Sequence, residues 1–565
     1  MTPLGAMVGA WLPERTAAKL AARGKKPNAL VGHPPPPIAG DPATARRLVG
    51  GVLLFDGRLV ESQDPTPWFL TPPDDAWAAD LHGHGWLDDA FAAEDPKVWA
   101  HLSNWAWEWL ENFEPGNGPG WRPDLVARRL TRQIAYSAEL LIGQPAERSR
   151  LFFDALGIQT AFLEWRWQHA KQGVQRLEAL SGLANALISL RGTGRATRQA
   201  VKRLGKMAAQ IVQPDGAVAS RSPEDLAQIV SLLEWSAVGI EDAGLKPNTD
   251  HLKALQRAAP ALKTLRHPDG SLGRFHGGRA GNSALLDRLL VQVSARALAP
   301  VPSGPVMGYA RLTGARTFCI LDASNSPTSP YAATAHSSAL AFEFSAAEMP
   351  MIVQCGSGMG FGERLARSSR RGPSHSTVEL ADHCPASVLR SRSGRHEENL
   401  AVHGHVMART SRDDRGSWAL CESSQYEEEL GLVIERRLHL SANGEQLEGE
   451  DTALATSAAG RGRMARVFGK GKPPCPITVR FHLHPRVRAK LALSGRAVAL
   501  THADGSRWIM RTDADRLEVE PSLYFDETRP KPRATLQIVA SSDLLEYWGR
   551  ITWSLDRIPE GAQPG

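Results

Sequence analysis

The chain has 565 residues, and its 66 Lys and Arg against 60 Asp and Glu give a net charge of +6 with neutral His. The apolar share of 42% and the charged share of 22% exclude wholesale disorder. No run of about 18 apolar residues predicts a membrane span. The mild positive charge suits an acidic ligand but does not indicate nucleic acid.

Tryptophan and cysteine divide the chain into two halves. Twelve of the 16 Trp precede residue 300, and all five Cys follow it. The odd number of cysteines, their wide spacing and the absence of a CxxC motif argue against a disulfide framework or a structural zinc site. We therefore expect buried free thiols and two halves of different construction.

The amino-terminal segment predicts no signal peptide. Within residues 1–26 the positive charges follow the short apolar stretch instead of preceding it, so the default location is cytoplasmic. Residues 32–42 include four consecutive prolines, which predict an extended strap. A hairpin is predicted over 48–62, where an Asp-Gly turn separates two apolar runs.

From about 95 to 297 the apolar spacing is helical. Pro123 opens one helix and Gly143 closes it, as expected for a helix start and stop. Short turns join the helical segments, which predicts antiparallel pairs in a bundle or an incomplete α/α toroid. The predicted helices cover 98–113, 123–143, 147–170, 174–192, 196–212, 222–239, 248–265 and 282–299.

After residue 305 the pattern changes to short segments with alternating apolar residues, separated by Asn-Gly, Asp-Gly and Ser-Gly turns. This texture predicts an antiparallel β-sandwich. The predicted strands lie within 308–324, 337–356, 374–382, 430–451, 477–485, 489–513 and 533–542. We therefore expect an N-terminal extension with a proline-rich strap over 1–80, a helical domain over 81–300 and a β-sandwich domain over 305–560.

Two sequence features after residue 355 are weak indications of a ligand site. Glycines at 356, 358, 360 and 362 resemble a phosphate cradle, but no P-loop lysine or βαβ unit accompanies them, which favours a tight loop. The arginines that follow, at 364, 367, 370 and 371, form either a solvated loop or a clamp for carboxylates or sulfates.

Histidines and tryptophans supply the other candidates. His336 and His375 each precede a predicted strand, and His482 and His484 share one strand face. Such imidazoles bind a metal or neutralise an acidic group, although each taken singly is more simply a hydrogen-bonded structural histidine. Aromatic and cationic side chains mix around 163–172 and 269–278, as suits sugar rings, and helix packing is the common alternative.

Several motifs together resemble the heparinase II/III-type family, from about residue 80 to the end. They are GHGWLDD, PDLVARRL, HPDGSLGRFHGG, AHSSALAFEF, SHSTVELAD, ERRLHLSANGEQLEGED and RFHLHP. The resemblance is especially close to a bacterial branch named only as heparinase II/III family protein. It implies an α+β multidomain fold, in which an N-terminal incomplete α/α toroid is followed by a C-terminal antiparallel β-sandwich.

The resemblance also implies a reaction. Characterised members of the family are lyases that cleave uronic-acid-containing polysaccharides by β-elimination. A neutralising group must face the carboxylate, a base then removes the C5 proton, and an acid protonates the departing O4. Active members place an Asn-His pair and a Tyr on toroid helices, and they place His and Asp residues, some of them zinc ligands, on the sandwich.

Carried over by position, the resemblance gives a partial site. His336 and His375 match the family's histidines, which makes both of them candidates for catalysis and for a divalent metal such as zinc whose third ligand is missing. Arg221 is the third catalytic candidate. The substrate-binding candidates are Arg274, His276, Arg371, Trp165 and Trp167.

Other family positions carry different residues in this chain. Asp225 stands where the tyrosine is expected, and Lys171 and Gln172 stand where the Asn-His pair is expected. In the sandwich, Thr334 replaces a histidine, and Ser338 and Gln354 replace aspartates. Either another set of residues performs the elimination or the enzyme function has been lost.

Three functions remain open. The first is a lyase acting on an acidic polysaccharide or oligosaccharide, and the second is a catalytically degenerate protein of the same fold that binds glycans in the cell envelope. The third is a uronyl epimerase or a glycoside hydrolase, for which Glu224 and Asp225 are the conceivable acids. The resemblance points to the cell envelope or periplasm, whereas the amino terminus favours the cytoplasm. The sequence leaves the oligomeric state open.

Overall fold

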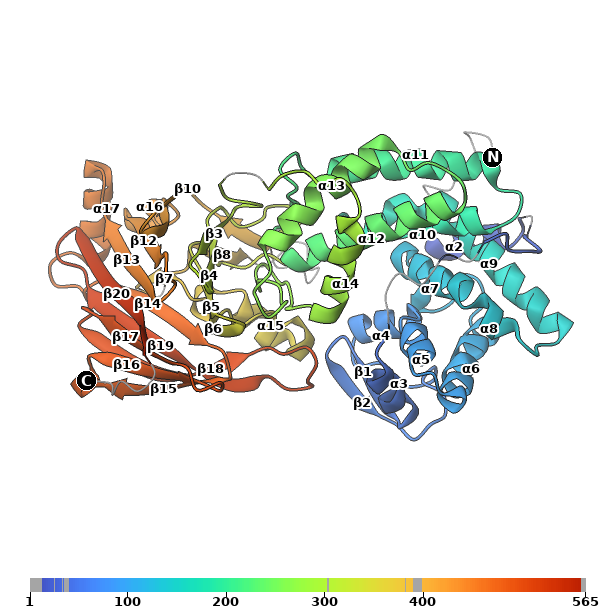
Figure 1. Ribbon diagram of the computed structural model, residues 1–565, viewed down its shortest axis with the longest axis horizontal. Helices are drawn as coiled ribbons and strands as arrows, with labels where there is room; N and C mark the ends of the chain where they lie inside the picture. Colours follow the sequence, from blue (N-terminus) through green and yellow to red (C-terminus); the bar gives the residue numbers. More distant parts are fainter. Residues whose placement is uncertain are drawn as a thin grey trace. The chain divides into compact units, whose positions relative to one another are not determined.

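The computed structural model describes residues 13–24, 26–32, 34, 40–301, 304–381, 383–389 and 399–559 (Figure 1). The first twelve residues, on which the signal-peptide question rests, lie outside the described residues. Three of the four consecutive prolines predicted to form a strap, at 35, 36 and 37, also lie outside them.

The chain divides into two compact units whose boundaries interleave along the sequence. Unit 1 comprises Met1–Pro214, Ala227–Ala259 and Arg288–Leu298. Unit 2 comprises Asp215–Leu226, Pro260–Asp287 and Ala299–Gly565. Two segments of the helical half, at 215–226 and 260–287, therefore belong to the same unit as the sandwich. The three domains expected from the sequence stay a prediction.

Among the described residues, two short helices precede a hairpin of β1 (Val52–Phe55) and β2 (Arg58–Glu61), which confirms the hairpin prediction. The helices that follow are mostly joined by short connections (Figure 1). The α-helices described in this half are α2 (Glu14–Ala21) and α3 (Pro42–Val49) before the hairpin, and after it α4 (Asp75–His82), α5 (Trp86–Ala92), α6 (Pro96–Asn112), α7 (Pro123–Ala135), α8 (Ser137–Leu141), α9 (Ala146–Arg166), α10 (Val174–Ser189), α11 (Gly194–Ile211), α12 (Pro223–Asp242), α13 (Thr249–Thr264) and α14 (Ser283–Ser294).

The local sequence explains these helices. In α6, Leu102, Trp105 and Trp109 recur at spacings of three and four and are all buried, so they form the face that packs on the rest of unit 1. Asp95 caps the start of α6, because its side chain accepts a hydrogen bond from the Lys97 amide. None of the described helices is long and apolar enough to cross a membrane.

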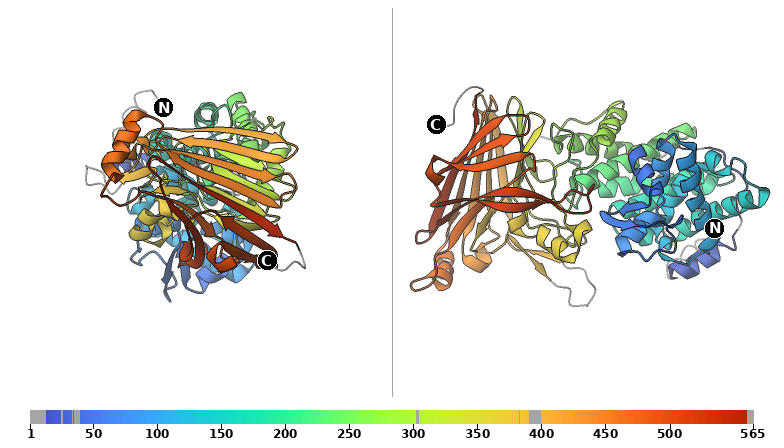
Figure 2. Two further views of the ribbon diagram at one scale, coloured as in Figure 1. Left: turned by 90° about the vertical axis from the view of Figure 1, so that its left-hand side faces the viewer. Right: turned by 90° about the horizontal axis from the view of Figure 1, so that it is seen from below.

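The carboxy-terminal half contains two eight-stranded antiparallel sheets, which stack face to face (Figure 2). One sheet has the order β10-β11-β12-β13-β20-β17-β16-β15, and the other has the order β18-β19-β14-β6-β5-β4-β3 with β7 paired to β14. The strands are β3 (Tyr309–Thr313), β4 (Thr317–Asp322), β5 (Phe342–Ala346), β6 (Met349–Val353), β7 (Val378–Leu380), β10 (Val406–Asp413), β11 (Gly416–Ser423), β12 (Val433–Ser441), β13 (Gln446–Leu454), β14 (Pro476–Leu483), β15 (Val487–Ala492), β16 (Ala497–His502), β17 (Arg507–Thr512), β18 (Arg516–Tyr524), β19 (Arg533–Asp543) and β20 (Trp548–Ile558). A separate hairpin pairs β8 (Ala386–Leu389) with β9 (Asn399–Val402).

Alternating apolar side chains build the core between the two sheets. Ile477, Val479 and Phe481 of β14 are fully buried, and Leu438 and Leu440 of β12 meet the same core from the other sheet. A helical half followed by an antiparallel β-sandwich is the fold class that the sequence predicts, and it is confirmed.

In the described part of the sandwich half, three α-helices interrupt the strands without being predicted by the strand pattern: α15 (Glu363–Ser369), α16 (Glu427–Leu430) and α17 (Ala458–Phe468). The longest of them, α17, is capped by Ser457, whose side chain accepts from the Gly460 amide. The glycine string predicted to be a tight loop leads into α15. These helices connect strands, and the alternating apolar pattern that predicts strands does not indicate them.

Candidate functional site

The candidate site lies within unit 2 and draws on both halves of the sequence. Arg221, Arg274 and His276 come from the helical-half segments 215–226 and 260–287, and His336 and His375 come from loops of the sandwich. All five side chains are at least nine-tenths buried. The structure therefore buries all five in unit 2, where Arg221, His276, His336 and His375 form one buried polar region.

Arg221 uses all five of its N–H groups inside this region. Nη2 donates to Asp322 Oδ1 at 2.5 Å and to a backbone carbonyl, and Nε and Nη1 donate to further carbonyls of residues 307, 324 and 325. The backbone of Arg221 is left-handed, with φ of 52°, and Tyr309 donates its hydroxyl to the Arg221 carbonyl. With its donors committed to the protein, Arg221 is held as a buried structural cation.

Asp322, at the end of β4, connects Arg221 to His276. Its Oδ2 lies 3.3 Å from His276 Nε2 and accepts from Ser338 Oγ at 2.8 Å. His276 Nδ1 accepts from the His336 amide, so the proton of the neutral ring sits on Nε2 and points at Asp322. Burial raises the pKa of Asp322, but the Arg221 charge and the His276 hydrogen bond outweigh this effect and lower it to about 2.

His336 and His375 lie side by side, with ring centroids 5.2 Å apart. His375 Nδ1 lies 3.2 Å from Gln354 Oε1, whereas the buried His375 Nε2 and His336 Nδ1 have no hydrogen-bond partner. Burial lowers the pKa of His375 to about 3 and the pKa of His336 well below its usual value. Both rings are therefore neutral near pH 7.

Gln354 contacts His375 of this pair, and Glu343 in turn holds Gln354. Gln354 Oε1 also accepts from the Ser376 amide, and Gln354 Nε2 donates to the backbone of β5. Glu343 accepts from the Gln354 amide at 3.1 Å and from His267 Nε2 at 2.9 Å. The position at which the family resemblance leads us to expect an aspartate is thus a neutral amide engaged in strand-to-loop hydrogen bonds.

Arg274 is also buried, but it faces another part of unit 2. Its guanidinium donates to the backbone carbonyls of Gln354, Cys355 and Phe525 and lies 4.0 Å from the centre of the Tyr524 ring. Gly356 makes room for it, since a Cβ there would lie 1.9 Å from Arg274 Nη2. Arg274 therefore fastens the segment 354–356 to the end of β18.

The other predicted substrate-binding residues are not part of this buried region. Arg371 is exposed, whereas its neighbour Arg370 is buried and donates to the carbonyls of Ala332 and Ala335. Trp165 and Trp167 belong to unit 1, at the end of α9 and in the short helix η2 (Trp167–His169), and Trp167 is buried. The buried region is thus composed of histidines and arginines without these tryptophans.

The two acids considered for hydrolysis lie at the start of α12. Glu224 pairs with Arg279, with Oε1 2.7 Å from Nε, and it also accepts from the Arg279 amide. Asp225 is half-buried, and its amide donates to Ser222 Oγ. Glu224 therefore has a structural role in joining two segments of unit 2.

The donor set does not fit a zinc ion. Within the described part of the chain, His336 and His375 bring two imidazole rings together, and the amide oxygen of Gln354 beside His375 already accepts from the Ser376 amide. Among the described residues, no group of three or more His, Cys, Asp or Glu is placed to hold a metal. Since zinc sites in proteins use three or four such ligands, the expected metal has no complete site here.

Sequence reasoning missed the two carboxylates that organise the region, Asp322 and Glu343. Each is a single acid inside or at the end of an apolar strand, and neither belongs to a recognisable motif. The available signal was an acidic residue in a predicted buried strand, because a buried carboxylate must be paired. His482 was considered as a ligand, and it instead bonds to Ser522 Oγ and to the Pro373 carbonyl.

Comparison with known proteins finds similarity over the carboxy-terminal half and, with one relative, over nearly the whole chain. Residues 296–554 match the family model described as heparinase II/III-like, C-terminal. The chain is 29% identical over 546 residues to FtsZ-localized protein C of Caulobacter vibrioides, which covers 94% of this chain and 91% of that protein.

Solved structures agree on the fold over nearly the whole chain. Heparinase III superposes with a TM-score of 0.69 at 15% identity, covering 96% of this chain and 90% of that one. A mutant of the heparan sulfate lyase HepC from Pedobacter heparinus gives a TM-score of 0.60 at 14% identity, covering 98% and 88%. The resemblance inferred from the motifs is therefore confirmed: residues 296–554 match the heparinase II/III-like C-terminal domain, and the chain shares the fold of heparinase III and of HepC.

Proposed function

We propose that this chain is a polysaccharide-lyase-fold protein that no longer performs β-elimination and acts instead as a binding component of the FtsZ-associated cell-division apparatus. The observation that carries the proposal is that Arg221 and Asp322 make all of their hydrogen bonds within the protein. The five guanidinium N–H groups and the carboxylate are satisfied within unit 2. A side chain that must neutralise a substrate carboxylate needs free donors, and Arg221 offers none.

The residues at the family's reactive positions support the same proposal. Lys171 and Gln172, where an Asn-His pair is expected, are exposed in the turn before α10. Asp225, where the tyrosine base is expected, has the wrong chemistry to remove a C5 proton next to a uronate, because two negative charges would meet. The expected elimination thus lacks its base and one of its neutralising pairs.

Similarity to FtsZ-localized protein C supplies the biological setting. That relative matches nearly all of both chains, whereas the lyases are similar at 15% identity or less. Its name states a location at FtsZ, and we extend that location to this chain. On this proposal the lyase fold serves as a scaffold whose buried polar region stabilises it.

A localisation experiment tests the proposal. A fluorescent fusion of the full chain, expressed in Caulobacter vibrioides, is expected to gather where FtsZ gathers and to disperse when FtsZ is depleted. Purified full-length chain is expected to sediment with polymerised FtsZ and to stay in the supernatant without it. A diffuse fusion together with no co-sedimentation would overturn the proposal.

A second candidate function, lyase activity on an acidic polysaccharide, is favoured by one observation. His336 Nδ1 and His375 Nε2 are neutral, neighbouring and without partners, which is the state that a general base requires. In that case one imidazole would take the C5 proton, the C5–H electron pair would form the C4=C5 double bond of an unsaturated uronyl end as the C4–O4 bond breaks, and the departing O4 would take a proton from the imidazolium or from water.

Ultraviolet absorbance separates the two candidates, because the unsaturated uronyl end absorbs and an intact or hydrolysed chain end does not. Heparan sulfate and chondroitin sulfate, incubated with the full chain, are expected to give no rise in absorbance. A steady rise that disappears in both His336→Ala and His375→Ala would establish the lyase instead. A rise that persists in both variants would point to a contaminating enzyme.

A further inference from the structure

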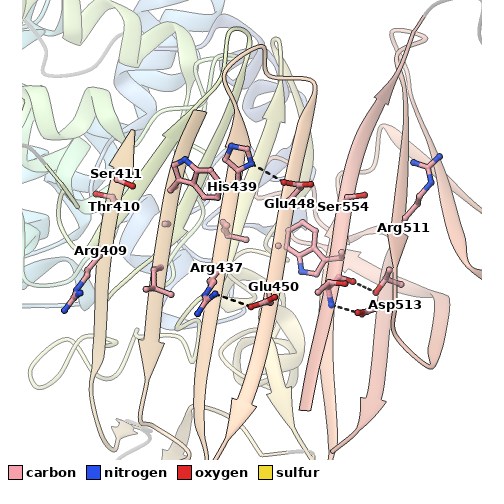
Figure 3. A pocket seen from close by; sticks show the side chains of 18 residues that line it. Arg409, Thr410, Ser411, Arg437, His439, Glu448, Glu450, Arg511, Asp513 and Ser554 are labelled. Atoms are coloured by element: carbon pink, nitrogen blue, oxygen red, sulfur yellow. Dashed lines mark hydrogen bonds and ion pairs between the residues drawn. The ribbon is translucent and has the colours of Figure 1, made fainter. Parts of the chain in front are cut away.

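A second feature of unit 2, apart from the buried polar region, is a groove on the outer face of the sheet that contains β10 to β13 and β20 (Figure 3). The groove has a volume of about 810 Å³. It crosses β10, β11, β12, β13, β20 and the end of β17, so its long direction runs across the strands. None of the residues of the buried region lines it.

Strand register explains why the groove is lined by polar and aromatic side chains. Residues that pair across neighbouring strands point to the same side of a sheet. Ala419 and Leu438 pair with each other and belong to the core, so the adjacent pair, Trp418 and His439, points outward. The outward row continues from His439 to Glu448, Ser554 and Arg511.

An aromatic pair occupies one end of this row. The rings of Trp418 and His439 stack with centroids 3.8 Å apart and planes 19° from parallel. Trp418 Nε1 is held by Asp413 at 3.3 Å. On the other side of the indole the paired residue is Ser411, which is too small to cover the ring, and the Arg415 guanidinium lies 5.6 Å from the ring centre. The indole face away from His439 lies under this guanidinium, whose side chain is 79% exposed, so a sugar ring that stacks on the indole displaces an exposed cation.

The charges that line the groove balance. His439 pairs with Glu448 at 3.1 Å, and Arg437 reaches Glu450 at 3.6 Å (Figure 3). These side chains are accessible, since Arg437 is 60% exposed and Glu448 is 48% exposed. The lining contains three guanidinium groups and three carboxylates: Arg409, Arg437, Arg511, Glu448, Glu450 and Asp513. A polyanion would meet as many repelling carboxylates as attracting arginines.

We propose that this groove binds an uncharged carbohydrate chain laid across the strands. Sugar hydroxyl groups donate and accept at once, so they suit alternating guanidinium and carboxylate groups, which supply both kinds of partner. The apolar C–H face of a pyranose ring stacks on an indole face such as that of Trp418. The groove is also long, open at the surface and lined by convergent polar groups, as are many ligand sites.

This inference is independent of the proposed function, because it concerns other residues and another ligand. Loss of FtsZ localisation would leave the groove and its ligand class unchanged. Equally, failure of the groove to bind sugar would leave the localisation proposal unaffected. The two proposals are therefore tested by separate experiments.

Isothermal titration calorimetry of the full chain tests the inference with three probes. Cellohexaose and the hexamer of N-acetylglucosamine are the uncharged chains, and a heparin-derived hexasaccharide is the anionic comparison. At least one uncharged chain is expected to bind, with an affinity that salt does not change. The heparin fragment is expected to bind more weakly or not at all.

Three substitutions locate the binding. Trp418→Ala removes the stacking face and is expected to weaken binding about tenfold. Ser554→Trp fills the middle of the groove and is expected to abolish binding. Trp548→Ala is the matched control, because Trp548 begins β20, is 52% exposed and does not line the groove. Its affinity is expected to equal that of the wild type.

Thermal melting of each variant shows whether it is folded, and Ser554→Trp keeps the test decisive if Trp418→Ala is unstable. Three results would overturn the inference. Neither uncharged chain binds the wild type, or binding survives both Trp418→Ala and Ser554→Trp, or only the heparin fragment binds and loses affinity as salt rises.

Discussion

Arg221 Nη2 donates to Asp322 Oδ1 at 2.5 Å, and this ion pair joins residues 101 positions apart inside unit 2. Asp322 is wholly buried, so removal of Arg221 would leave an uncompensated carboxylate in the core. Such a change costs about 3–5 kcal/mol. We therefore expect Arg221→Ala to lower the free energy of unfolding of unit 2 by this amount, measured by urea unfolding with near-ultraviolet circular dichroism.

The control for this prediction is an exposed ion pair in the same unit. Arg516 Nη2 lies 3.1 Å from Asp543 Oδ1, and both side chains face solvent. Exposed pairs of this kind contribute little, so Arg516→Ala is expected to unfold at the wild-type urea concentration. If Arg221→Ala also unfolded there, the pair with Asp322 would not have the structural role assigned to it.

The pH dependence of stability is expected to report on His375. In the unfolded chain its pKa is near 6.5, whereas burial lowers the pKa of His375 in the folded chain to about 3. Between these two pH values the unfolded state binds more protons, so stability falls as the solution is acidified. One such proton gives a slope of about 1.4 kcal/mol per pH unit. His375→Asn is expected to reduce the slope between pH 6.5 and 3 by this amount.

Asp322 affects the pH dependence of stability in a different pH range, so its variant serves as the comparison for His375→Asn. Its folded pKa of about 2 lies below the ordinary value of 3.8, so its contribution is complete above pH 3.8 and disappears as the pH falls toward 2. Asp322→Asn is thus expected to leave the slope between pH 6 and 4 as it is in the wild type. Urea unfolding at a series of pH values measures both variants, and equal slopes for His375→Asn and the wild type would contradict the prediction.

Zinc is expected to leave the stability of the chain unchanged. His336 and His375 are the two nitrogen donors, and the amide oxygen of Gln354 already accepts from the Ser376 amide and contacts His375. Two imidazoles in a closed pocket hold zinc weakly. The melting temperature of the purified chain should be the same with added zinc as with a chelator. A rise with zinc that His375→Ala abolishes would show that a metal site forms after all.

Much of the fold could be predicted because it depends on local patterns. Leu102, Trp105 and Trp109 mark the buried face of α6 by spacing alone, and Ile477 and Val479 mark the buried face of β14 by alternation. The helix α17 was not predicted, because it is a short helix between two strands whose start depends on the Ser457 cap. The two-residue periodicity of strands contains no information about helices inserted between them.

The buried region was only partly predictable, since its members are far apart in sequence. His336 and His375 were found through motif positions, but Asp322 became visible only when Arg221 and His276 met at its carboxylate. The outward row of the groove was unpredictable for the same reason. Trp418 and Arg511 lie on one surface only because the strand order places β11 and β17 in the same sheet. Long-range pairing of this kind is a property of topology, which a single sequence does not display.

Gly356 provides a last test of how the buried arginines are held. Its backbone is left-handed, with φ of 89°, and a Cβ would lie 1.9 Å from Arg274 Nη2. Gly356→Ala therefore adds backbone strain and also forces the guanidinium away from its carbonyl partners. Strain alone costs about 1–3 kcal/mol, and displacement of a buried cation adds to it. We expect a large loss of stability in urea unfolding.

A matched glycine separates the two effects. Gly505 has the same φ of 89°, and a Cβ there would meet nothing within 4 Å. Gly505→Ala thus carries the strain without the clash, and it is expected to destabilise the chain by the smaller amount. The difference between the two variants measures the cost of moving Arg274. Equal losses would mean that the Arg274 guanidinium shifts freely, and its contacts with the carbonyls of Gln354, Cys355 and Phe525 would then not fasten that segment.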